Sequence, residues 1–331
     1  EAGRKLIAQQ YAGVTGILKQ VGESMRSGTE ILPAQEKELR TYAEAFGRVR
    51  TVAAWKDRRG RLHLELTGEC VQRILRSQEG FTSGLGALMH VTLTKPETQY
   101  DSGGMRLMFR EQEPYYITVG IGTRTREGQQ ISGDCVRYFT TEEGIACVIL
   151  SDGMGSGSSA CKESEMVLDL VERFLEAGFS LETAIRMMNS AMVMKGENDI
   201  YSTLDLCMVN LYSGMARLYK VGAAAAFIRR EDEVECIASE NLPVGARAHL
   251  DAKPREIQLN DGDFIVMVTD GVLEYLHVPK PEETMREMIL SIKTNNPGIL
   301  AKKIMDRVML FTGGRAQDDM TVLAACIWKK A

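Results

Sequence analysis

The sequence has no apolar run long enough to cross a membrane. Its longest stretches of this kind, residues 221–228 and 320–328, are far shorter than the roughly 20 residues that a spanning helix needs. No signal peptide is visible, and the chain lacks an initiator Met, so it reads as a fragment of a longer protein. We expect this fragment to be cytoplasmic, with room for a membrane anchor upstream in the parent protein.

Clusters of basic residues, cysteines and histidines are missing as well. The net charge is -5 and no long stripe of Lys or Arg is present, which argues against a nucleic-acid partner. The 7 cysteines, an odd number without any Cys-x-x-Cys, are typical of reduced thiols in a cytosolic protein. The 4 histidines are too scattered to match the ligand spacing of a zinc site.

What the sequence does contain is an apolar strand that runs into Asp-Gly, and it contains this pattern twice. Residues 145–153 read IACVILSDG, residues 264–271 read FIVMVTDG, and an acidic pair at 318–319 precedes another strand-like run. A carboxylate at the end of a buried strand is costly unless a cation meets it. Strand ends so far apart in sequence converge only at the rim of a sheet, where their repulsion predicts divalent cations between them. Taken alone, each Asp-Gly also fits a tight turn that caps a helix.

The glycine-rich loop at 152–158 has a second interpretation. It follows a strand and precedes a helix, which is the context of a nucleotide-binding loop. No Gly-Lys-Ser or Gly-Lys-Thr follows, however, and a carboxylate directly ahead of the first glycine would repel a pyrophosphate. Nucleotide binding is therefore disfavoured. Arg124 and Arg126, upstream of Asp134, are candidates for contact with a phosphate group, although they also fit a solvated strand.

We expect the region 1–112 to be regulatory, because its part 48–112 has neither an acidic cluster nor a Gly-rich loop. Its first part, 1–47, is predicted to be a helical pair. Apolar residues recur at heptad spacing from Ile7 to Met25, which fits either a coiled-coil dimer or an amphipathic helix packed on its own domain. A second helix is expected to begin at Pro33.

The second part of this region, 48–112, is predicted to be a small α/β insert. The run 52–55 and the run 62–66 flank a polar turn, which indicates a hairpin. Thr67 is expected to cap a short helix, and a strand-like run follows at 88–93. No chemistry is assigned to the insert.

Residues 113–331 are predicted to form one α+β domain. Many strand-like segments are interrupted by a pair of adjacent helices between 159 and 196 and by a last helix near 298–310. Many strands with paired helices favour a sandwich of sheets flanked by helices. The strand spacing is too irregular for a βαβ barrel.

The order of the motifs resembles that of the metal-dependent protein serine/threonine phosphatases, the PPM family. The motifs that carry this likeness are SGD at 132–134, SDGMG at 151–155, TDGV at 269–272 and DDMTV at 318–322. Within the bacterial branch that acts in sigma-factor partner switching, the chain is most similar to the stage II sporulation protein E family. That likeness adds YSTLDL at 201–206, KVG at 220–222 and NLPVG at 241–245. It covers about 115–328, and the N-terminal third matches loosely, as a regulatory segment.

The resemblance implies two Mn²⁺ or Mg²⁺ ions. Asp152 would bridge them, the Gly153 carbonyl would complete one coordination shell, Asp270 and Asp318 would hold the first ion, and Asp134 would contribute to the second. Two metals ~4 Å apart activate a water for in-line attack on a phosphate monoester, so no Cys, Ser or His nucleophile is required. All-oxygen ligands favour Mg²⁺ or Mn²⁺ over zinc.

The sequence departs from the wider family at three positions. Gln129 stands where eukaryotic members have a phosphate-binding Arg, Gly133 stands in place of a Glu, and Asp319 replaces an Asn. These departures imply a sparser metal site and a different manner of holding the phosphate.

The implied partner is a phosphorylated anti-anti-sigma protein, whose dephosphorylation would release a sporulation sigma factor. The helices between 159 and 196 resemble the element whose movement assembles the metal site in the sporulation phosphatase, and we call them the switch helices. Met188 and Met192 within them, and Leu18 in the heptad run, are expected regulatory residues, and a homodimer through the N-terminal or switch helices is a further expectation. The alternatives are a PPM phosphatase of a stress partner switch and a non-catalytic phosphatase-like scaffold.

Overall fold

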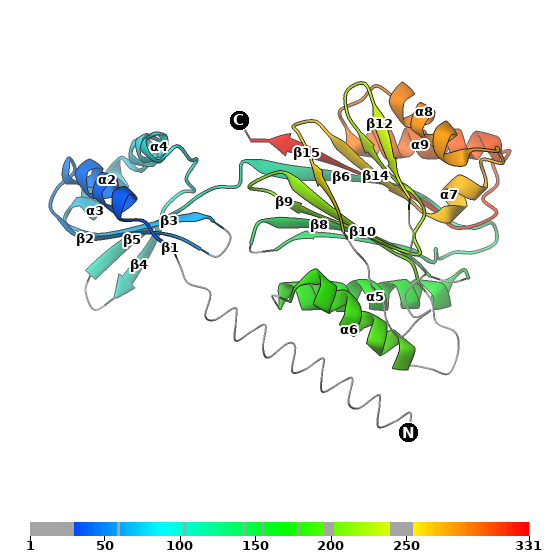
Figure 1. Ribbon diagram of the computed structural model, residues 1–331, viewed down its shortest axis with the longest axis horizontal. Helices are drawn as coiled ribbons and strands as arrows, with labels where there is room; N and C mark the ends of the chain where they lie inside the picture. Colours follow the sequence, from blue (N-terminus) through cyan, green and yellow to red (C-terminus); the bar gives the residue numbers. More distant parts are fainter. Residues whose placement is uncertain are drawn as a thin grey trace. The chain divides into compact units, whose positions relative to one another are not determined.

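The computed structural model divides into two compact units at Pro114 and Tyr115. It describes residues 30–57, 60–101, 104–141, 143–153, 155–177, 179–194, 202–238 and 254–330 (Figure 1). The heptad run with Leu18 and the NLPVG segment at 241–245 lie outside the described residues.

The first unit is a five-stranded antiparallel sheet with helices packed on it. Its strand order is β1-β2-β3-β5-β4. The strands are β1 (Glu30–Ile31), β2 (Val49–Lys56), β3 (Leu62–Gly68), β4 (Glu97–Asp101) and β5 (Gly104–Arg110), and the helices are α2 (Pro33–Glu44), α3 (Cys70–Arg76) and α4 (Gln78–Met89). The expected hairpin is β2 and β3, and the helix from Pro33 packs in the same core as the sheet.

Alternation along β3 explains how this core forms. Leu62, Leu64 and Leu66 point to one face and are buried beneath the helices, as the period of two in a strand requires. The strand expected at 88–93 is wrong, because α4 continues to Met89. Phe81, Leu85 and Met89 recur every four residues and bury one face of that helix, so helical packing prevails over the local strand-like run.

The second unit contains two further five-stranded sheets among its described residues. One has the order β13-β10-β9-β8-β7 and the other β12-β11-β14-β15-β6. Their strands are β6 (Tyr115–Arg124), β7 (Asp134–Thr140), β8 (Ile145–Asp152), β9 (Leu204–Asn210), β10 (Met215–Val221), β11 (Ala226–Arg229), β12 (Val234–Ile237), β13 (Arg255–Gln258), β14 (Phe264–Val268) and β15 (Met320–Lys329). All of the strand pairs within them are antiparallel.

Helices cover the outer face of each of these sheets, as Figure 1 shows. The helices α5 (Ser158–Glu176) and α6 (Leu181–Met194) pack on the sheet of β7 to β10, whereas α7 (Asp270–Glu274), α8 (Pro281–Ser291) and α9 (Pro297–Phe311) lie on the side of β14 and β15. A third apolar core, with Leu150, Cys207 and Leu323 among its members, fills the space between the two sheets. The result is a four-layer sandwich. No helix in the described parts of the chain combines the length and apolar character that a membrane span requires.

Candidate metal centre

The four predicted aspartates lie at chain positions that bring them to one end of the sandwich. Asp134 is the first residue of β7 and Asp152 the last of β8, and the two are register partners across the antiparallel pair. Asp270 begins α7, two residues after the end of β14, and Asp318 lies two residues before the start of the neighbouring strand β15. Each sheet therefore presents two carboxylates at its edge.

A hydrogen bond between side chains joins the two sheets at this end. Thr269 donates its hydroxyl proton to Asp134 Oδ2 over 3.0 Å, and its own Oγ1 accepts from the Thr321 backbone N–H at 2.9 Å. The threonine that precedes Asp270 thus fixes the position of Asp134, a ligand candidate from the opposite sheet. Asp270 and Asp318 each accept a hydrogen bond from the backbone N–H of the following residue, at 2.7 and 2.9 Å.

The carboxyl groups at this end destabilise one another's charge. Burial, together with the carboxylates of Asp134 and Asp270, raises the pKa of Asp152 to about 10. Burial is also the main cause that raises the pKa of Asp134 to about 6, and burial and the Asp270 carboxylate raise the pKa of Asp318. In the absence of a cation, the cluster must therefore hold at least one proton at neutral pH.

The donor chemistry of the cluster fits a hard divalent cation. Carboxylate and carbonyl oxygens are the ligands that Mg²⁺ and Mn²⁺ prefer, and a cation would remove the repulsion that raises the pKa of Asp152. Asp134 Oδ1 is buried and has no hydrogen-bond partner among the described residues, so it has a free acceptor position. As the side chains stand, no three His, Cys, Asp or Glu residues of the described chain are gathered closely enough to hold an ion. Binding would have to draw the carboxylates together.

The backbone around Asp152 is held by the start of β9. The Thr203 backbone N–H and the Ser202 hydroxyl both donate to the Asp152 carbonyl, at 2.8 and 2.9 Å, and the Asp152 N–H donates to Thr203 Oγ1 at 3.0 Å. Ser151 adds a donated bond of 2.8 Å to the Thr203 carbonyl. Ser202 and Thr203 of the STLDL run therefore hold Asp152, the central ligand candidate, through hydrogen bonds to its backbone.

Gly153 lies directly against the first switch helix. A Cβ at this position would be 2.3 Å from the Ala160 carbonyl oxygen and 2.9 Å from Ser164 Oγ, so only glycine allows this approach to α5. Ser164 is fully buried and donates a 2.7 Å hydrogen bond to the Gly133 carbonyl, next to Asp134. A displacement of α5 must therefore move the backbone on both sides of the predicted site.

The predicted regulatory residues fall in different places. Met188 of α6 is buried in the core that α5 and α6 share with β8 to β10. Met192 lies in the last turn of the same helix, and Leu18 lies outside the described residues. Met188 thus packs in the same core as the strands that carry Asp134 and Asp152. The regulatory role of all three residues stays a prediction.

Asp319 has a structural role that sequence reasoning missed. Its two carboxylate oxygens accept hydrogen bonds from the backbone N–H groups of Arg126 and Gly133, at 2.8 and 2.7 Å. It therefore ties the loop that leads to Asp134 to the start of β15. The guanidinium of Arg126 opposes the rise in the pKa of Asp318, whereas Arg124 forms an ion pair with Asp306 at 3.6 Å. The acidic pair at 318–319 was the sequence signal for this role, but the partners of Asp319, Arg126 and Gly133, are too distant in sequence to be predicted from it.

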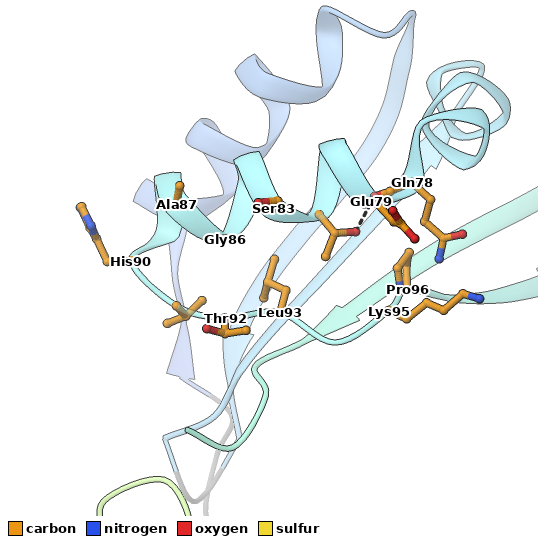
Figure 2. Close-up of a pocket in the computed structure, with 12 residues that line it drawn as sticks. Gln78, Glu79, Ser83, Gly86, Ala87, His90, Thr92, Leu93, Lys95 and Pro96 are labelled. Carbon is orange, nitrogen blue, oxygen red and sulfur yellow. Dashed lines mark hydrogen bonds between the residues drawn. The ribbon is translucent and has the colours of Figure 1, made fainter. Parts of the chain in front are cut away.

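A larger groove in the N-terminal unit does not gather comparable chemistry. It has a volume of about 860 Å³ and lies between α4 and the segment 90–96. Figure 2 shows His90 at one end of the groove and Glu79 with Lys95 at the other. Because its titratable side chains are spread along the groove, we do not regard it as the active site.

Comparison with known proteins agrees with this architecture. Residues 142–328, more than half of the chain, match the family described as Stage II sporulation protein E (SpoIIE). The chain is 28% identical over 334 residues to stage II sporulation protein E of Bacillus subtilis (strain 168), which covers 98% of this chain and 40% of that protein. The counterpart from Priestia megaterium is also 28% identical, over 98% of this chain and 56% of its own length. The chain thus spans less than two thirds of either relative.

A solved structure supports the same relationship. The PP2C phosphatase domain with a fragment of the regulatory domain of the cell fate determinant SpoIIE from Bacillus subtilis is 25% identical, and it superposes with a TM-score of 0.73. The match covers 99% of this chain and 97% of that one. The predicted α+β sandwich of the PPM type, flanked by helices and preceded by a smaller region, is thereby confirmed. The chain belongs to the stage II sporulation protein E family.

Proposed function

We propose that this chain is a metal-dependent protein serine phosphatase that removes phosphate from an anti-anti-sigma protein and so releases a sporulation sigma factor. The observation that carries the proposal is the pair of carboxylates that each sheet presents at one end of the sandwich, in a member of this family. The raised pKa of Asp152 supports the need for a cation there. The N-terminal unit would be regulatory.

The proposed ligands are Asp134, Asp152, Asp270, Asp318 and the Gly153 carbonyl. Two Mn²⁺ or Mg²⁺ ions, when bound, would supply an activated water for in-line attack on the phosphoserine monoester. Within the chain, Thr269 orients Asp134 through its hydrogen bond, and β9 holds the backbone of Asp152. Asp270 is exposed and Asp152 partly so, which leaves the carboxylate edge open to a phosphorylated side chain.

Selectivity would come from docking of a folded partner. An activated water has little preference for one alkyl phosphate over another, so the protein around the phosphoserine must be recognised at a distance from the metals. We expect a strong preference for the intact phosphoprotein over a short peptide with the same phosphoserine. Equal catalytic efficiency on the two would contradict docking.

The test is phosphate release from a phosphorylated anti-anti-sigma protein. The native chain should release phosphate with Mn²⁺ and stop in excess EDTA, and Asp152→Asn should be inactive while remaining folded. Asp232→Asn, in the exposed turn between β11 and β12, is the matched control and should keep full activity. Full activity of the native chain in EDTA, or of Asp152→Asn with Mn²⁺, would refute the mechanism. A folded, Mn²⁺-binding chain with no turnover would favour the scaffold alternative.

A further inference from the structure

A buried ion pair lies just below the predicted metal site. Lys220 Nζ is 2.5 Å from Asp205 Oδ2, and the two side chains are only 5% and 1% exposed. Asp205 is on β9 opposite Lys220 of β10 and opposite Leu150 of β8, two residues before Asp152. The two charges therefore lie in the sheet of β7 to β10, level with the position two residues before Asp152.

On its own two strands, the pair has apolar neighbours on the same face of the sheet. Asp205 and Cys207 are two residues apart on β9, and so are Lys220 and Leu218 on β10, so each pair of side chains points to the same face of the sheet. Cys207 and Leu218 pack in the core between the two sheets. Removing two charges from water is expensive, and an apolar pair of similar volume is often at least as stable. Stability alone is therefore a weak reason for an ion pair at this place.

One oxygen of the pair is unused. Asp205 Oδ2 accepts from Lys220, but Oδ1 is buried and has no hydrogen-bond partner among the described residues. Burying an acceptor without a partner is unfavourable, so such an atom in a fold of this kind points to a bound water or ligand.

The unused oxygen belongs to a residue that lines a cavity shared with the site. This cavity has a volume of about 10 Å³, and Asp152, Asp270, Thr203 and Thr269 line it together with Asp205. That volume is about the size of one water, and the lining offers enough polar partners to hold it. The cavity connects the inner ion pair to two of the proposed ligands.

We propose that Asp205 is a positioning residue of the metal centre: its free Oδ1 accepts a hydrogen bond from a water that is held in the cavity against Asp152 and Asp270. The inference rests on the proposed function, since the water matters only if those carboxylates bind metal. Lys220 balances the charge of Asp205, so that the carboxylate orients the water without adding net repulsion to the acidic edge. This assigns a role to the polar positions of the STLDL and KVG motifs.

The test removes the acceptor while keeping the fold. Asp205→Leu/Lys220→Met replaces the pair by apolar side chains, whereas Asp205→Asn/Lys220→Met also removes the charges but keeps an acceptor oxygen. The control is Arg217→Met/Glu256→Leu, which deletes an exposed ion pair of 2.8 Å between β10 and β13. Thermal melting reports the fold, and electron paramagnetic resonance of free Mn²⁺ reports the dissociation constant independently of turnover.

We expect the Leu/Met variant to melt near the native temperature and to bind Mn²⁺ about 10–100-fold more weakly, the usual effect of losing a group that orients a ligand. The Asn/Met variant should recover most of the affinity, and the control should match the native chain. Should the Leu/Met variant not fold, Asp205→Val/Lys220→Met, which removes the acceptor with a smaller β-branched side chain suited to a strand, should show the same loss.

Native Mn²⁺ affinity in a folded Leu/Met or Val/Met variant would overturn the inference and leave the proposed function standing. Equal weakening in the Asn/Met and Leu/Met variants would overturn the acceptor role, because only the charge would then matter. If the native chain itself binds no Mn²⁺, the proposed function fails, and the role of Asp205 fails with it.

Discussion

Substituting Asp152 by Asn should make the metal-free protein more stable at alkaline pH, even though it should abolish turnover. The carboxyl of Asp152 lies beside those of Asp134 and Asp270, and burial with this repulsion raises its pKa to about 10. The isosteric amide keeps the shape of the side chain and carries no charge. It therefore removes the repulsion that a metal-free fold must otherwise relieve by taking up a proton.

The sign and size of the effect follow from the two pKa values. The pKa of an unfolded Asp is about 3.9, so folding takes up a proton between that pH and the folded pKa of about 10. The contribution of Asp152 to the free energy of unfolding is then largest below pH 4 and falls as pH rises, by at most about 1.4 kcal/mol per pH unit. Because the side chain is partly open to water, we expect about half of that limit, or about 2 kcal/mol between pH 6 and pH 9.

The assay is urea unfolding of chelator-treated protein at several pH values in this range. The native chain should lose stability as pH rises, Asp152→Asn should lose much less, and Asp232→Asn should behave like the native chain. Saturating Mn²⁺ should flatten the native profile, because the ion replaces the proton. A native profile that is flat or rises with pH in EDTA would refute the proposed electrostatics, as would an equal slope in Asp152→Asn.

Three further outcomes test the packing around the site. Gly153→Ala should destabilise the protein by about 1–3 kcal/mol in the same urea titrations, because the added Cβ overpacks against α5. The control Gly80→Ala, where a Cβ meets nothing within 4 Å, should be neutral or stabilising. Asp319→Ala should cost about 1–3 kcal/mol, since the buried Gly133 N–H loses its acceptor, and Asp319→Asn should cost less; equal thermal melts would contradict this. Arg137→Met, which breaks ion pairs of 2.7, 2.9 and 3.1 Å to α5, should cost less than about 1 kcal/mol at low salt and less again at high salt, because all of these side chains are at least partly open to water.

The strands that end in aspartate could be predicted from the sequence because the signal is local. Apolar runs of strand length followed by Asp-Gly predict Asp152 and Asp270 at strand ends; in the structure Asp152 ends β8 and Asp270 lies two residues beyond β14. The helices α5 and α6 could also be predicted, because each has apolar residues at helical spacing and a glycine, Gly178, separates them in the sequence. Where local signals conflicted, as at 88–93, the apolar face of α4 prevailed over the strand-like run.

The contacts that hold the site residues in place could not be predicted, because they join residues that are distant in sequence. Asp319 acts through the backbone of Gly133, 186 positions earlier in the chain. Asp205 and Lys220 belong to two different strands, and only the register of β9 on β10 makes them a buried pair. A pattern of residue types carries no information on which strands become neighbours.

The number of Mn²⁺ ions bound per chain tests the proposed metal centre most directly. Isothermal titration calorimetry of the chelator-treated protein, in two buffers of different ionisation enthalpy, gives the stoichiometry and the protons released together. We expect two ions per native chain with release of protons at pH 7, because Mn²⁺ displaces the proton that the raised pKa of Asp152 retains. Asp152→Asn should lose at least one ion and most of the proton release. No binding by the native chain, or an unchanged stoichiometry and affinity in Asp152→Asn, would contradict a metal centre built on these carboxylates.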